Sequence, residues 1–235
     1  MANTIHPLSR RLAAVGALVR QGTKVADIGT DHAYLPVYLV GSGHNPCAVA
    51  SDIGAGPLSK AEQTVREAHL QDRIQTVLAD GLHGFAQYGV QDIVIAGMGG
   101  ETAADILLSA PFICDPAVRL ILQPMTKSHV LRRFLWENGF AILHDVLCED
   151  DRIYEILCAV YDGKTRTATP AEYLVGKECL TSRDELSVRY LNRRAAVLRR
   201  VIEGKQSAGL PAAWEAQALR EMEDAICAYG NCMKS

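Results

Sequence analysis

DIGTDHAYLP, residues 27–36, decides the fold, because it joins a short apolar run to a helical pattern through a sharp turn. A strand that turns directly into a helix needs a residue that accepts unusual backbone angles, and Gly29 provides it. In open α/β sheets such a turn lies at the carboxyl edge of the strands, where ligands bind. The stretch therefore predicts a ligand site at this edge. The alternative interpretation is an ordinary turn of a flavodoxin-like domain.

Short apolar runs and helical patterns alternate on both sides of this turn. Strands are predicted at residues 25–28, 47–51, 74–78, 92–96, 120–123, 140–148 and 154–161, and helices at 33–40, 58–68, 101–109 and 130–138, after an earlier helix that opens at Pro7. Such alternation implies crossover connections and a parallel sheet with helices on both faces. The last two strands follow each other directly and predict an antiparallel edge hairpin. The predicted fold class is α/β, a Rossmann-like sheet on the class I methyltransferase plan.

The pattern changes after residue 162. Apolar residues recur at spacings of three and four over 188–202 and again over 219–229, with a loop holding Gly204, Gly209 and Pro211 between them. Ser182-x-x-Glu185 matches a capping box before the first of these helices. The two stretches predict an antiparallel helical hairpin, a coiled coil. We therefore expect a domain over residues 1–162 and an appendage over 163–235.

The composition is that of a globular protein, with 49% hydrophobic and 22% charged residues and no apolar run long enough to span a membrane. The seven cysteines form no C-x-x-C pair, and residues 1–8 lack a signal-peptide pattern, so we expect a cytoplasmic protein without a structural metal. Residues 1–162 are acidic, whereas residues 163–235 carry 12 basic and 9 acidic residues. A basic appendage suggests a polyanionic partner, although a solvated helical face explains it nearly as well.

The glycine fingerprint of dinucleotide-binding turns, G-x-G-x-x-G, is broken in this chain. Gly29 remains, but Asp31 and Tyr34 stand at the other two glycine positions. A pyrophosphate needs backbone N–H groups around it, and a carboxylate at Asp31 would repel it. The same carboxylate suits S-adenosylmethionine, which carries an ammonium and a sulfonium and no phosphate. We therefore predict this methyl donor as the cofactor, with Asp27 gathering its ammonium directly or through water.

Two further acidic residues follow the second and third predicted strands. Asp52 stands where an acid can accept hydrogen bonds from both ribose hydroxyls of an adenosine, although NAD sites and helix caps use acids in the same way. Asp80 and Gly81 stand where the adenine ring of the cofactor would lie, and an ordinary Asp-Gly turn is the alternative.

The fourth predicted strand leads into IAGMGGE, residues 95–101, whose three glycines let the backbone approach two ligands closely. Enzymes that methylate an exocyclic amine of a nucleic acid usually carry Asp/Asn-Pro-Pro-aromatic at this place. Its absence favours a ring nitrogen as the acceptor, because the lone pair of a ring nitrogen attacks without prior loss of a proton. His32 and Tyr34 would flank this site, although a lone histidine is equally often structural.

Taken together, these motifs resemble a known family. LSRRL (8–12), DIGTDHAYLP (27–36), ASDIGAGPL (50–58), DGL (80–82), IAGMGG (95–100), LILQP (120–124) and RIYEI (152–156) are similar to the bacterial tRNA adenine-22 N1-methyltransferases, 22 being the tRNA position. The resemblance implies a cofactor site formed by Arg11, Asp27, Gly29, Asp31, His32, Asp52, Ile53, Asp80, Gly81, Ala96, Gly97 and Met98. It also implies that the helical hairpin helps to hold tRNA. Met125 stands where the family often has asparagine, so any contact to the target base there would differ.

We therefore hypothesise methyl transfer from S-adenosylmethionine to N1 of an adenine in tRNA, at position 22. Because N1 lies on the Watson–Crick edge, the base must be extruded into the pocket. Asp31 would stabilise the developing positive charge, and Tyr34 would stack on the base or hydrogen-bond to it. Basic residues expected to contact tRNA phosphates are Lys164, Arg166, Arg189, Arg193, Arg194, Arg199 and Arg200.

Two alternatives stay open. A methyltransferase acting on a small molecule or a protein would be active without RNA and indifferent to the basic hairpin. A degenerate Rossmann module that dimerises through the hairpin would bind no S-adenosylmethionine. No membrane or metal partner is expected, and the chain is expected to be a monomer or a weak dimer.

Overall fold

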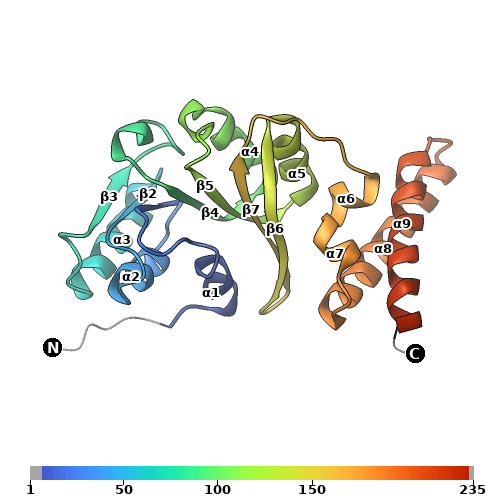
Figure 1. Ribbon diagram of the computed structural model, residues 1–235, viewed down its shortest axis with the longest axis horizontal. Coiled ribbons are helices and arrows are strands. Elements are labelled where there is room, and N and C mark those ends of the chain that lie inside the picture. The colour runs from blue at the N-terminus through green and yellow to red at the C-terminus, as the bar shows by residue number, and fades with distance from the viewer. Residues whose placement is uncertain (1–6, 233–235) are drawn as a thin grey trace.

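The computed structural model describes residues 7–232 and arranges them as a seven-stranded sheet with helices on both faces (Figure 1). The strands are β1 (Val25–Ile28), β2 (Ala48–Asp52), β3 (Ile74–Leu78), β4 (Asp92–Gly99), β5 (Arg119–Thr126), β6 (Phe140–Glu149) and β7 (Ile153–Tyr161). Their spatial order is β3-β2-β1-β4-β5-β7-β6, and β7 runs antiparallel to both of its neighbours. The strands from β3 to β5 pair in parallel. The predicted parallel sheet with an antiparallel edge hairpin is confirmed.

Two hydrophobic clusters fill the two sides of the sheet, because buried strands present apolar side chains to both faces. One cluster joins the sheet to α1 (Arg10–Gly16), α2 (Tyr34–Gly41) and α3 (Ala55–Glu67). The other joins it to α4 (Gly100–Leu108), α5 (Ser128–Glu137) and the short 3₁₀ turns η1 (Phe85–Tyr88) and η2 (Pro111–Ile113). In Figure 1 the first group of helices lies below the sheet and the second above it.

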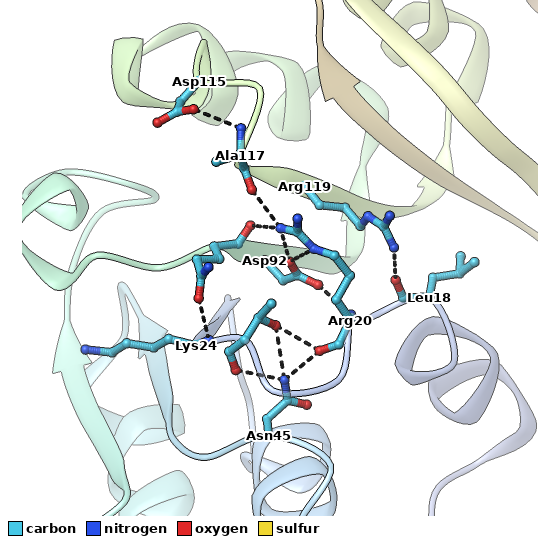
Figure 2. A network of polar contacts seen from close by, with 10 residues as sticks. Leu18, Arg20, Lys24, Asn45, Asp92, Asp115, Ala117 and Arg119 are labelled. Atoms are coloured by element: carbon cyan, nitrogen blue, oxygen red, sulfur yellow. Dashed lines mark hydrogen bonds and ion pairs between the residues drawn. The ribbon is translucent and has the colours of Figure 1, made fainter.

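A polar network closes the amino edge of the sheet, on the side opposite to the predicted ligand site. Asp92, the first residue of β4, is fully buried, and it accepts hydrogen bonds from the Arg20 backbone N–H at 2.6 Å and from Arg20 Nε at 2.7 Å. Figure 2 shows Arg20 reaching on to the Ala117 carbonyl, while Asn45 donates to the carbonyl of Arg20. The network fixes the segment between α1 and β1, and so the strand that carries Asp27.

Four helices follow the sheet, and they stand beside its β6–β7 edge (Figure 1). They are α6 (Pro170–Val175), α7 (Lys177–Thr181), α8 (Glu185–Ser207) and α9 (Ala213–Cys232). The last two form the predicted antiparallel hairpin, with Leu191, Leu198 and Met222 buried between them. The short helices α6 and α7 were not predicted.

Two predictions about this region are wrong. Ser182 does not cap α8, because the cap is Asp184, whose carboxylate accepts from the Ser187 N–H at 2.8 Å. The capping box lies earlier, at Thr169 and Glu172, where it starts α6. Gly204 belongs to α8 and not to the loop, since the helix runs on to Ser207. A single glycine inside a helix costs only about 1 kcal/mol, which packing readily offsets.

A buried ion cluster ties the helical appendage to the sheet. Arg132 of α5 is fully buried and donates to both carboxylate oxygens of Asp145, at 2.7 and 2.8 Å, and to Glu155 at 2.6 Å. Its remaining donor reaches the carbonyls of Tyr173 and Leu174 at the end of α6. A Cβ on Gly176, whose φ is +80°, would lie 2.0 Å from Asp145. The glycine between α6 and α7 therefore lets the helices close over the cluster.

Candidate functional site

A cavity of about 330 Å³ opens at the carboxyl edge between β1 and β4, where the strand order reverses. Gly29 turns the chain with a φ of +77°, and its N–H and that of Thr30 both donate to the Ser51 carbonyl at 2.8 Å. The structure brings seven of the predicted cofactor residues to this cavity: Arg11, Asp27, Gly29, Asp31, His32, Ala96 and Gly97. The size is within the range of small-ligand sites.

Asp27 is the buried acid at the floor of this cavity, with 9% of its surface exposed. Burial raises the pKa of Asp27 to about 6, and this rise is partly opposed by a hydrogen bond with Thr30 and by the charge of Arg11. A cation placed beside a buried carboxylate stabilises its ionised form, because the attraction offsets the solvation that the carboxylate lost on burial. The chemistry of the site therefore fits the ammonium of S-adenosylmethionine.

Arg11 enters the cavity from the first helix, α1, and three contacts fix its position. Its Nη1 donates to Gln123 Oε1 at 2.6 Å, and its guanidinium lies 5.5 Å from the ring centre of Tyr154. Its backbone N–H donates to Asp150 at the tip of the β6–β7 hairpin. Gln123 and Tyr154 were not predicted as site residues, although both lie in motifs, LILQP and RIYEI, that carry the family resemblance.

Asp31, His32 and Tyr34 line the outer part of the cavity. The carboxylate of Asp31 lies 3.2 Å from His32 Nε2 and 3.4 Å from Lys60 Nζ, and 63% of the side chain is exposed. The rings of His32 and Tyr34 are stacked, with 5.0 Å between their centres. A flat exposed pair next to a carboxylate can receive an aromatic base that becomes cationic.

The adenosine-binding residues predicted for β2 and β3 lie beside the cavity and not in its lining. Asp52 ends β2, and its Oδ1 accepts from the Gly54 N–H at 2.7 Å. The Ala79 N–H donates to the Asp52 carbonyl, which brings the exposed Asp80 and the turn at Gly81 to the same edge. Ile53 is 69% exposed beside them. These residues therefore share the carboxyl edge of the sheet with the cavity and lie on its β3 side.

The glycines at the end of β4 and the start of α4 serve different purposes from one another. Gly97 has a φ of +87° and open space around it, and it lines the cavity. A Cβ on Gly29 would lie 2.0 Å from the terminal methyl of Met98, so the two loops touch. A Cβ on Gly100 would lie 2.3 Å from the Lys127 carbonyl oxygen. Gly100 therefore admits the neighbouring β5–α5 turn, and Gly97 is the one of the three glycines that lines the cavity.

The basic residues predicted to bind RNA are divided among several places. Arg189 is paired with Glu149 at 2.6 Å, and Arg199 with Glu223 at 2.6 Å. Arg200 is exposed on α8. Lys164 and Arg166 follow the end of β7, which pairs with the start of β5, so they lie at the amino edge, opposite the cavity. Arg166 is also paired with Asp162.

Arg193 and Arg194 lie elsewhere, in a second cavity of about 300 Å³ between α8 and the end of β5. Met125 lines the same cavity, and its sulfur lies 3.3 Å from Arg152 Nη2. We call this the interdomain cavity. Within residues 7–232 no helix is long and apolar enough to cross a membrane, and no group of His, Cys, Asp and Glu side chains in that range could hold a metal ion.

Lowering the pH from 7 to 5 is expected to weaken S-adenosylmethionine binding about tenfold. In the role predicted for Asp27, only its ionised carboxylate would attract the ammonium, and a pKa raised by burial to about 6 means that the ionised form predominates at pH 7 and is scarce at pH 5. Because the pKa of Asp27 is raised, the attraction between its carboxylate and the ammonium is complete at pH values above that pKa and is lost as the pH falls through it. Calorimetric titration of the cofactor at several pH values measures the effect.

The matched control for this titration is Asp27→Asn, which keeps the size of the side chain and removes its charge. Its affinity is expected to be low and nearly constant from pH 5 to pH 7. If the variant keeps the wild-type pH dependence, that dependence does not arise from the carboxylate of Asp27.

Comparison with known proteins places this geometry in context. The model of a methyltransferase domain family matches residues 8–157. The tRNA (adenine(22)-N(1))-methyltransferase of Bacillus subtilis is 36% identical over 169 residues, which are 68% of this chain and 71% of that protein.

Two solved structures with bound cofactor or cofactor product resemble most of this chain. A Streptococcus pneumoniae protein in complex with S-adenosyl-L-methionine superposes with a TM-score of 0.81 at 30% identity, covering 94% of this chain and all of that one. TrmK of M. capricolum, in complex with S-adenosyl-homocysteine, gives a TM-score of 0.78 at 26% identity, covering 94% and 98%.

Proposed function

Since the chain belongs to the tRNA (adenine(22)-N(1))-methyltransferase family, we propose that it transfers a methyl group from S-adenosylmethionine to N1 of adenine 22 in tRNA. The observation that carries the proposal from the structure is the buried Asp27 in a cavity built from the family's own motifs. A buried acid with a raised pKa suits an ammonium, and no phosphate-binding glycine fingerprint surrounds it. We further propose that residues 1–162 carry out methyl transfer and that residues 163–235 hold the RNA.

The cofactor supplies an electrophilic methyl group on a sulfonium. Asp27 binds the ammonium, Asp52 accepts from the ribose hydroxyls, and Asp80 accepts from the amino group of the cofactor's adenine. Arg11, held by Gln123 and Tyr154, closes the inner wall and keeps the charge of Asp27 balanced. Ile53, Gly81, Ala96, Gly97 and Met98 supply the remaining surface at this edge.

The acceptor side of the site works by position and charge. The stacked His32–Tyr34 pair receives the extruded adenine, and N1 attacks through its own lone pair, so that no general base is required. Asp31 stabilises the positive charge of the product. In the free protein Asp31 is exposed and paired with Lys60, so its field acts on the base only when RNA excludes water from the site.

Incubation of the protein with labelled S-adenosylmethionine and unmodified tRNA is expected to label the RNA and to create one reverse-transcription stop at adenine 22. A methyl on N1 blocks Watson–Crick pairing and halts the reverse transcriptase, whereas most other methylations do not. Label without a stop would contradict N1 chemistry. Transfer of label without RNA would favour the small-molecule or protein methyltransferase, and failure to bind the cofactor would favour the inactive module.

A further inference from the structure

The interdomain cavity is formed by both parts of the chain. The end of β5 and the start of α5 form one wall, Arg152 and Tyr154 of the β6–β7 hairpin form the second, and Arg193 and Arg194 of α8 form the third. Two contacts join the first two walls, since Ser128 of α5 donates to Glu155 of β7 and the buried Arg132 of α5 donates to Glu155 as well. The cavity is therefore bounded by elements whose relative positions are held by side-chain contacts.

Its electrostatic character is strongly positive. Arg152, Arg193 and Arg194 have no ion pair within 4 Å in the described range of the chain, in contrast to Arg189 and Arg199 on the same helix α8. Lys127 lines the cavity as well but is paired with Glu101.

The acid in the lining, Glu155, is already compensated. Burial alone would raise the pKa of Glu155, but the neighbouring Arg132 and the hydrogen bonds from Ser128 and Arg132 hold that pKa below its ordinary value. Burial and the charges of Arg194, Arg132 and Arg133 lower the pKa of His129 in the same wall. Neighbouring arginine charges contribute to both shifts, and an anion bound in the cavity would balance those charges.

The interdomain cavity lies one side chain away from the cofactor cavity. Two guanidinium groups lie close to the ring of Tyr154: that of Arg11, which lines the cofactor cavity, at 5.5 Å from the ring centre, and that of Arg152, which lines the interdomain cavity, at 4.8 Å. An anion bound by Arg152 is thus adjacent to any base that faces the cofactor.

We propose that the interdomain cavity binds one backbone phosphate of the RNA next to the extruded target nucleotide, held by Arg152, Arg193 and Arg194. Guanidinium groups match the oxygens of a phosphate with paired hydrogen bonds, and the approach of arginines from two walls, the β6–β7 hairpin and α8, fixes its position. This inference rests on the proposed RNA substrate and adds the place at which the protein holds the RNA backbone. Clamping one phosphate there limits where the extruded base can reach, so the cavity sets the register between RNA and cofactor.

The test compares Arg193→Gln/Arg194→Gln with the matched control Arg183→Gln/Arg220→Gln, which removes the same charge from exposed sites on the appendage outside the cavity. Affinity for unmodified tRNA is measured over a range of salt concentrations. The cavity variant is expected to bind at least about tenfold more weakly and to lower the slope of log K against log salt by about two, whereas the control changes little. If the two double variants lose tRNA affinity equally, the cavity acts only as part of a diffuse basic surface, and the proposal is overturned.

Phosphate-ethylation interference then locates the contact. The wild type is expected to reject tRNA that is ethylated at a linkage adjoining the methylated adenine, and the cavity variant is expected to lose that one signal and keep the others. Arg152→Gln, on the opposite wall, is expected to lose the same signal. An unchanged interference pattern, or a lost signal remote from the methylated adenine, would refute the assignment.

The readouts separate this inference from the proposed function. Mapping of reverse-transcription stops on the wild type tests the function without any variant, and the interference pattern is obtained without methyl transfer. Calorimetry with S-adenosylmethionine is expected to give the same affinity for the wild type and the cavity variant, since Arg193 and Arg194 lie outside the cofactor cavity. This result also confirms that the variant is folded.

Discussion

Arg132→Met is expected to destabilise the protein by about 3–5 kcal/mol, because it leaves the carboxylates of Asp145 and Glu155 buried without their cation. Methionine keeps the length and the apolar stem of the side chain, so the loss comes from charge and hydrogen bonding. Equilibrium unfolding in urea, followed by tryptophan fluorescence and circular dichroism, measures the change in the free energy of unfolding.

The neighbouring Arg133 supplies the matched control. It is exposed on the same helix, with its guanidinium 5.1 Å from the ring centre of Tyr173, so Arg133→Met is expected to cost about 1 kcal/mol or less. A triple variant, Arg132→Met/Asp145→Leu/Glu155→Met, is expected to recover part of the lost stability, because no unpaired charge is left in the interior. If Arg132→Met and Arg133→Met unfold alike, the cluster does not stabilise the fold as proposed.

Asp52→Ala is expected to weaken S-adenosylmethionine binding by about 100-fold. Two hydrogen bonds from ribose hydroxyls to a carboxylate are together worth about 3 kcal/mol, which corresponds to this factor. The Asp52 oxygen that accepts from the Gly54 N–H is partly committed to the turn, so removal of the side chain also loosens the start of α3. Calorimetric titration with the cofactor gives the affinity directly.

Asp72→Ala is the control for this measurement, because Asp72 is an exposed acid on the segment between α3 and β3, away from the cavity lining. It is expected to bind the cofactor as the wild type does. An affinity of Asp52→Ala within about threefold of the wild type would exclude the ribose contact, since a lost pair of charged hydrogen bonds costs more than that.

The parallel sheet and its turn at Gly29 could be predicted from the sequence because both depend on local patterns. Apolar runs of strand length, a glycine at a sharp turn and acids after strands are visible without knowing the fold. The cavity accordingly contains Asp27, Asp31 and His32 as expected. The parallel pairing and the antiparallel edge hairpin followed from the alternation and from the two consecutive strands at the end, whereas the spatial order of the strands was not predicted.

Other features depend on contacts between distant segments, and the sequence hides them. Arg132 reads as an ordinary surface arginine of an amphipathic helix, yet α6 and two carboxylates from β6 and β7 enclose it. The spacing between Arg11 and Gln123 gives no sign that they touch. Lys164 and Arg193 belong to one basic segment by composition, but the antiparallel course of β7 places Lys164 at the far edge of the sheet.

The order of the strands also affects how the chain is synthesised. β7 is the last strand in the sequence, yet it fills the place between β5 and β6. While the ribosome is still making β6 and β7, the apolar strand β5 has a free edge, which is a site for mispairing with other chains. That edge stays unpaired until β7 has been made, and the pairing of β7 with β5 then covers it.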